Sequence, residues 1–72
     1  MFVVGVEDRH TDISIYLYNN REEAVTRAFS EASLGSRGGK IELNSYPGWI
    51  AHFTYSSEGD CAWVMEMEPE DG

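Results

Sequence analysis

Four stretches of the chain alternate hydrophobic and polar side chains with a period of two residues, which is typical of β-strands. A fifth stretch, from Phe2 to Val6, is continuously apolar and rich in β-branched residues, so it also predicts a strand. The four alternating strands are predicted at Ile13–Tyr18, Lys40–Tyr46, Trp49–Tyr55 and Cys61–Met67.

The alternation between residues 13 and 18 separates an aliphatic side from a polar and aromatic side. We expect the aliphatic side chains to face the helix, with Tyr16 and Tyr18 on the opposite face of the sheet. His52 or Trp63 would join the tyrosines, depending on register, because a slip of one residue exchanges the faces of a strand. The residues expected on the helix side are Ile13, Ile15, Leu17, Ile41 and Leu43.

The segment after Asn20 has helical periodicity. Asn20 is a suitable N-cap, and Glu23 occupies the reciprocal position of a capping box. Gly35 is expected to end the helix with a positive φ. The predicted buried stripe follows the i, i+3, i+4, i+7 spacing and consists of Val25, Ala28, Phe29 and Ala32. We therefore predict that Phe29 is buried, together with Phe53 of the fourth strand.

Turn signals join these elements into one domain. Pro47-Gly48 predicts a turn, and residues 56–60 predict a hairpin loop that makes 49–67 a hairpin with one apolar side. The resulting order is β-β-α-β-β-β, an α+β fold in which one helix packs on one face of an antiparallel sheet of about five strands. We assign residues 1–68 to this domain and residues 69–72 to an acidic C-terminal tail.

The composition fits a small folded domain. Hydrophobic residues make up 42% of the 72 residues, and the single Cys61 excludes an internal disulfide. The start MFVVGVEDRH lacks the pattern of a signal peptide, and no stretch approaches the length of a membrane span. A reducing, cytoplasmic location and no membrane association are therefore expected.

Charge is distributed unevenly along the chain. The net charge is −8, and all five bases lie at or before Lys40. From Ile41 onward the chain carries seven acids and no base, so this half repels nucleic acid and attracts basic surfaces. Direct nucleic-acid binding is disfavoured, because it needs Lys and Arg against phosphate. The alternative is that the acids only keep a small protein soluble.

No group of residues has the pattern of a catalytic or metal site. A Cys61–His52 dyad across the hairpin is conceivable, but Asp60 beside the cysteine raises a thiol pKa, and a buried apolar cysteine is commoner. The loop from Gly35 to Lys40 precedes a strand rather than a helix, unlike a phosphate-binding loop. We expect a non-enzymatic protein without a cofactor or metal.

Four ionisable residues crowd the first turn. Their spacing fits no known cation-binding loop, and Arg9 lies among them, so a solvated turn is the preferred interpretation over a metal site. These residues are Glu7, Asp8, His10 and Asp12.

The outline of the chain is given by the helix REEAVTRAFSEA, the segment GKIEL and the hairpin WIAHFTY-SSEGD-CAWVMEM. This outline resembles that of small phage-encoded inhibitor proteins. These include anti-CRISPRs and other host-takeover factors. The resemblance covers the whole chain in size, charge and element order, and it rests on no motif. Many such proteins are DNA mimics that present carboxylates where a partner expects phosphates. The resemblance implies an inhibitor that acts in the host cytoplasm.

The leading functional prediction is an inhibitor that presents its acidic surface to a nucleic-acid-handling protein. Glu66 and Glu68 would lie about 6.6–7 Å apart on one side of a strand, close to the spacing of successive phosphates. Alternate acids on an edge strand also block aggregation, so the spacing leaves both interpretations open. The acidic candidates for the partner-binding surface are Glu58, Asp60, Glu66, Glu68, Glu70 and Asp71.

The alternative prediction is an interaction module or accessory subunit that uses an aromatic face of the sheet. A single helix covers one face only, and Tyr16 and Tyr18 are the candidates on the other. A homodimer formed by pairing of sheet faces or edges is predicted on the same ground.

Overall fold

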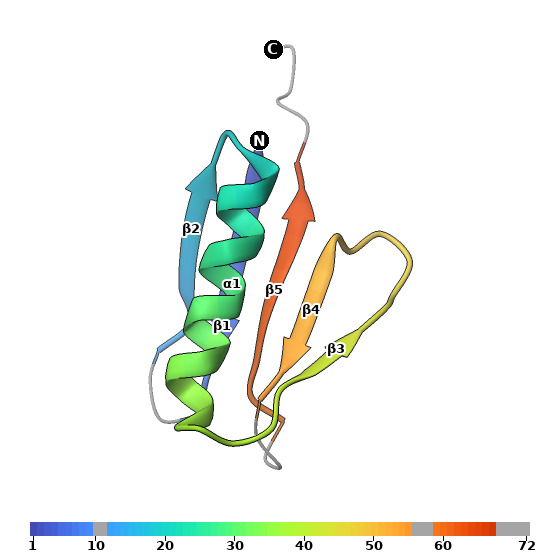
Figure 1. Ribbon diagram of the computed structural model, residues 1–72. Helices are drawn as coiled ribbons and strands as arrows, with labels where there is room; N and C mark the ends of the chain where they lie inside the picture. Colours follow the sequence, from blue (N-terminus) through green and yellow to red (C-terminus); the bar gives the residue numbers. More distant parts are fainter. Residues whose placement is uncertain (10–11, 56–58, 68–72) are drawn as a thin grey trace.

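The computed structural model describes residues 1–9, 12–55 and 59–67, and it confirms the predicted α+β order (Figure 1). Five antiparallel strands form one sheet in the order β2-β1-β5-β4-β3, and α1 lies across one face, mainly over β1 and β5. The elements are β1 (Phe2–Glu7), β2 (Ser14–Tyr18), α1 (Arg21–Ser36), β3 (Glu42–Asn44), β4 (Ala51–Thr54) and β5 (Cys61–Glu66).

The helix begins as predicted and packs through small residues. The Asn20 side chain accepts a hydrogen bond of 3.1 Å from the backbone N–H of Glu23. Three alanines spaced four residues apart form the fully buried line of α1, so the helix backbone lies close to the sheet. These residues are Ala24, Ala28 and Ala32.

The prediction that Phe29 is buried was wrong, whereas burial of Phe53 is confirmed. Phe29 is 51% exposed and Phe53 is 7% exposed. The rings still touch in a T-shaped contact, with centroids 5.6 Å apart. The contact line of the helix runs through the alanines, so Phe29 lies at the margin of that line and half of its side chain remains exposed.

The helix continues past Gly35 to Ser36, and its left-handed cap is Arg37, two residues later than the cap predicted at Gly35. Arg37 adopts the left-handed conformation with φ of 52°, and its N–H donates to the carbonyl of Leu34. Gly35 lies inside α1, where a Cβ would approach the Tyr55 ring to 2.3 Å. Gly35 is therefore needed for the Tyr55 ring to pack on the helix, and Tyr55 is 3% exposed.

The two faces of β2 are exchanged relative to the prediction. Tyr16 pairs with the fully buried Val4 on the helix side of the sheet, and its ring lies under the Arg27 guanidinium at 3.9 Å. Tyr18 shares this side and packs against the core. Alternation places Ile15 and Leu17 on the other side, where they are 53% and 57% exposed. Ile13, just before β2, is 65% exposed.

Strand β3 lies beyond the reach of the helix, as Figure 1 shows. Leu43 pairs with Phe53 and so lies on the helix side, but it is 69% exposed because α1 makes no contact with β3. The prediction that Leu43 belongs to the core was wrong. Ile41, which precedes β3, is half-buried against the core as expected.

The β4–β5 hairpin is apolar on both sides, which corrects the prediction of a single apolar side. Phe53 pairs with Ala62 on the helix side, and Thr54 pairs with Cys61 on the opposite side. Trp63 and Met65 consequently face away from α1, while Val64 is fully buried beneath it. The register pairs odd-numbered positions of β4 with even-numbered positions of β5. The predicted apolar row of β4, which includes Phe53, therefore lies on the opposite side of the sheet from the predicted apolar row of β5, which includes Trp63.

Candidate functional site: the open face of the sheet

The sheet side opposite α1, called the open face below, lacks a covering element in the described residues. Strand register assigns its members in three rows that cross the sheet. These are Leu17, Val3 and Met65; then Ile15, Gly5, Trp63, His52 and Asn44; then Glu7, Cys61, Thr54 and Glu42.

One corner of the open face is aliphatic. Ile15 and Leu17 on the edge strand β2 are more than half exposed, and Val3 and Met65 beside them are half-buried. The neighbouring Ile13 is the most exposed of the three aliphatic residues in this segment. Contiguous exposed aliphatic side chains of this kind are typical of a surface that binds another apolar surface.

Aromatic rings fill the centre of the open face. The Trp63 indole lies on Gly5, where a Cβ would come within 2.1 Å of Cζ2. Only glycine therefore leaves space for the ring to lie flat on β1. Trp49 contacts Trp63 with ring centroids 5.1 Å apart, and His52 with centroids 5.5 Å apart. Tyr46 completes the group with an edge contact to His52 at 5.1 Å.

A tight turn before β4 positions Trp49. The Trp49 N–H donates to the carbonyl of Tyr46 at 3.2 Å, with Pro47 and Gly48 between them, and Gly48 has φ of 85°. Proline followed by a glycine with positive φ is the pattern of a type II turn, so the predicted turn is confirmed. The turn brings Tyr46 and Trp49 onto the same His52 ring from the two sides of the loop.

Glu7 fixes the position of the Trp63 indole in the aromatic group. Its Oε2 accepts a hydrogen bond of 2.8 Å from Trp63 Nε1 and one of 3.6 Å from Cys61 Sγ. Burial, followed by the charge of Glu7, raises the pKa of Cys61 to about 11. The thiol therefore stays protonated at neutral pH, so Cys61 is a hydrogen-bond donor and a poor nucleophile.

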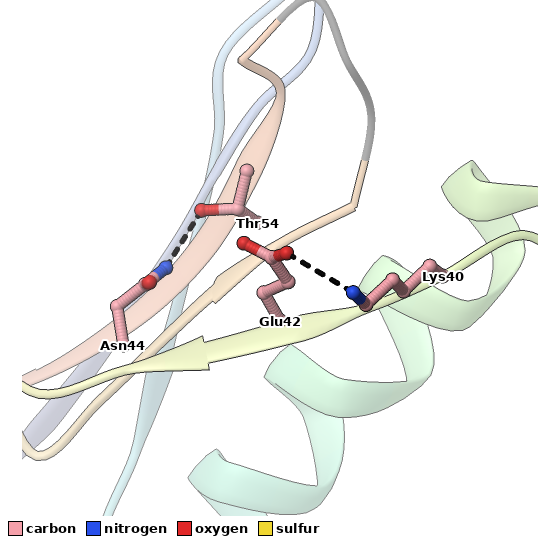
Figure 2. Close-up of polar contacts among 4 residues, drawn as sticks. All are labelled: Lys40, Glu42, Asn44 and Thr54. Carbon is pink, nitrogen blue, oxygen red and sulfur yellow. Dashed lines mark hydrogen bonds and ion pairs between the residues drawn. The ribbon is translucent and has the colours of Figure 1, made fainter.

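The third part of the open face, at the edge strand β3, is polar. Asn44 Nδ2 donates to Thr54 Oγ1 at 2.8 Å, and Lys40 Nζ lies 3.5 Å from Glu42 Oε1 (Figure 2). Both Lys40 and Glu42 are largely exposed, so this ion pair adds little stability. The positions that the register assigns to the open face include two carboxylates, Glu7 and Glu42, and no Lys or Arg.

A separate polar cluster connects the end of β1 to the ends of β4 and β5 that lie next to the hairpin loop. Tyr55 Oη donates to Asp8 Oδ2 at 2.8 Å, and the Arg9 N–H donates to Asp60 Oδ1 at 2.9 Å. Burial, and then the bond to Asp8, raise the pKa of Tyr55 well above its usual value. These bonds join the residues after β1 to the ends of the β4–β5 hairpin, so the cluster orients the sheet rather than forming a site.

Of the six acidic residues predicted to bind a partner, the structure describes only Asp60 and Glu66. Asp60 is 4% exposed and belongs to the polar cluster, so its carboxylate serves the fold. Glu66 is exposed at the end of β5. Glu58, Glu68, Glu70 and Asp71 lie outside the described residues.

The two predicted aromatic candidates face the wrong side for the proposed aromatic surface. Tyr16 and Tyr18 pack beneath and beside α1, and the residues that replace them on the open face are Trp49, Trp63, His52 and Tyr46. The sequence prediction included His52 or Trp63 on this face. It did not use Gly5, a glycine within a strand, which indicates that a large ring such as the Trp63 indole can lie against the backbone there.

The weaker chemical candidates find no support in the geometry. Cys61 pairs with Thr54, and its hydrogen-bond partner is Glu7 rather than His52. No group of three or more metal-ligating side chains occurs in the described part of the chain. The loop from Gly35 to Lys40 borders a hollow of about 480 Å³ that is lined in part by Lys40. This hollow adjoins the C-terminus of α1, and the carbonyl groups there disfavour binding of a phosphate.

Comparisons with protein-family models, curated proteins and solved structures found no match. The roles of the residues above are therefore inferred from their geometry alone. Within residues 1–9, 12–55 and 59–67, no helix is long and apolar enough to cross a membrane.

Proposed function

We propose that this chain is a non-enzymatic binding protein that docks a basic protein partner on its open face. The observation that carries the proposal is the exposure of Ile15 and Leu17 beside the Trp49–Trp63 pair, on a face that α1 leaves uncovered. Aromatic groups surrounded by aliphatic side chains are typical of the central part of protein interfaces.

The apolar corner supplies affinity. Full burial of a leucine or isoleucine side chain contributes about 1.5–3 kcal/mol, so covering the exposed half of Ile15 and of Leu17 contributes about 1 kcal/mol each. Tryptophan adds a large contact area with little loss of conformational entropy, and Trp49 and Trp63 are already held by ring contacts and by Glu7. The surface is therefore preorganised, which lowers the cost of binding.

Charge selects the kind of partner. The protein has a net charge of −8, and the open face carries Glu7 and Glu42 at one end, with Lys40 already paired to Glu42. A partner that combines apolar side chains with Lys or Arg complements both features. Proteins that handle nucleic acid have surfaces of this composition, so inhibition of such a protein is consistent with the resemblance to phage inhibitors.

The experiment is capture from a host lysate by immobilised protein, with two matched leucine variants. Leu17→Ser removes an exposed leucine of the open face, and Leu34→Ser removes one from the outer side of α1, where Leu34 is 74% exposed. We expect Leu17→Ser to lose the captured protein and Leu34→Ser to retain it. Equal retention by both variants would contradict docking on the open face.

The DNA-mimic prediction remains a second candidate because of the charge distribution: after Lys40 the chain has seven acids and no base. Replacing Glu66, Glu68, Glu70 and Asp71 together by Gln or Asn tests it. If the tail acids meet the partner, this variant lowers the association rate and flattens its salt dependence, whereas Leu17→Ser does not flatten it. A quadruple variant that associates as fast as the parent at low salt excludes the tail as the contact.

A further inference from the structure

The two edges of the sheet differ in a way that concerns self-association. At one edge, β3 is only three residues long and carries Glu42, with Lys40 beside it. Short, charged edge strands are a common protection against pairing with another chain. At the other edge, β2 is five residues long and contains no charge, no proline and no glycine.

Backbone groups on the outer side of β2 have no strand partner in the described part of the chain. An edge strand directs alternate N–H and C=O groups outward, and another strand satisfies them in a regular ladder. The exposed Ile15 and Leu17 on the same strand add apolar surface next to those groups. Both features favour addition of a strand at β2.

We propose that β2 pairs with β2 of a second copy of this chain, antiparallel and about a twofold axis at Tyr16. This register pairs all five residues of Ser14–Tyr18, and a shift in either direction shortens the ladder. It also places Ile15 against Leu17 of the second copy, twice, on the open face. A strand that pairs with itself in this way forms a closed, isologous interface.

The absence of charge on β2 selects a second copy over a basic partner at this edge. Each chain carries −8, so two copies repel each other, and pairing through the uncharged β2 avoids direct contact between like charges. The register places Asp12 opposite Asn20 of the second copy, so no two carboxylates face each other at the ends of the ladder. The dimer joins two sheets into one and leaves both aromatic groups uncovered on the same side.

The test is site-specific disulfide cross-linking in a Cys61→Ser background. A mixture of Ile15→Cys and Leu17→Cys proteins should form a heterodimeric disulfide under mild oxidation, because the register places these positions directly opposite each other. Each variant alone should cross-link at least tenfold more slowly, because identical positions are offset along the ladder. The matched control is a mixture of Glu42→Cys and Asn44→Cys proteins. These positions flank Leu43 on the β3 edge as Ile15 and Leu17 flank Tyr16 on β2, and they should not cross-link.

Sedimentation equilibrium of the unmodified chain gives an independent readout. We expect a dimer at micromolar concentration that strengthens as salt increases, because salt screens the repulsion between the copies. The proposal is overturned by a monomer at all concentrations and salt levels. It is also overturned if Ile15→Cys and Leu17→Cys each cross-link alone as fast as in the mixture, since that pattern indicates contact without the β2 register.

Discussion

The two faces of the sheet differ in how far their apolar side chains are buried. Beneath α1 the fully buried residues are small, with Val4 and Val64 meeting the alanines of the helix. On the open face, Ile15, Leu17 and the two tryptophans remain at least partly exposed. The small residues beneath the helix permit a short distance between helix and sheet, whereas the exposed side chains of the open face leave apolar area available to another molecule.

This difference separates stability from binding. Substitutions on the covered face should act on folding, because its side chains are already buried. Substitutions of the exposed side chains on the open face should act on association, because their apolar area is still in contact with water. The predictions below test this division, beginning with the largest effect.

The largest expected effect separates two phenylalanines that touch each other. Phe53→Ala should lower the free energy of unfolding by about 3–5 kcal/mol, because Phe53 is 7% exposed. Phe29→Ala should cost no more than about 1–2 kcal/mol, because half of Phe29 is in water. Urea denaturation of both variants measures the difference. Equal losses would mean that Phe29 belongs to the core.

The next prediction concerns Cys61, which belongs to the open face and yet is 8% exposed. Its pKa is raised to about 11, so alkylation of the folded protein at pH 8 should be about a hundredfold slower than for an ordinary thiol. Because the folded pKa lies above the unfolded value, the stabilising contribution is present below pH 9 and is lost as pH rises toward 11. Rapid alkylation at pH 8 in the folded state would contradict this placement.

A glycine substitution sharpens the comparison within the open face itself. Gly5→Ala places a methyl group within 2.1 Å of the Trp63 ring, so the indole must leave its position on β1. We expect a loss of stability of about 1–3 kcal/mol and a change in tryptophan emission. Unchanged emission would show that the indole does not lie on Gly5.

Sequence patterns predicted the elements of this fold better than the faces. Alternation at Ile13–Tyr18 identifies a strand whichever side is buried, so it does not decide whether Ile15 or Tyr16 faces the helix. Arg27, which lies over Tyr16 from α1, makes the tyrosine side suitable for the helix, and this contact is between residues distant in the sequence. The predicted buried stripe of the helix included Phe29 because phenylalanine is more hydrophobic than alanine. The observed stripe consists of alanines because small side chains allow the helix to approach the sheet closely.

The candidate site was predictable only in part. A single helix on a five-stranded sheet leaves one face uncovered, and this much follows from element count. The aromatic group depends on the β4–β5 register, which sets His52 beside Trp63 and Phe53 beside Ala62. Neither composition nor periodicity specifies that register, so the sequence prediction left open whether His52 or Trp63 lies on this face, and the register places both there.

The smallest expected effect on stability is at the edge of the open face. Leu17→Ser should change the free energy of unfolding by less than about 1 kcal/mol, since Leu17 is 57% exposed. Leu34→Ser serves as the control, with a similarly small change. A loss at Leu17 as large as that for Phe53→Ala would remove the distinction between the two faces.

The central claim is that the open face binds a basic, apolar protein segment, and the two tryptophans report on that face directly. Both Trp49 and Trp63 belong to it, so their emission can be followed while a peptide of alternating lysine and leucine is added. The account predicts a saturable emission change with the lysine peptide and none with a glutamate–leucine peptide. The affinity should fall as salt increases, and it should be about fivefold lower for Leu17→Ser, which is the loss of about 1 kcal/mol. No emission change with the lysine peptide, or the same change with both peptides, would contradict it.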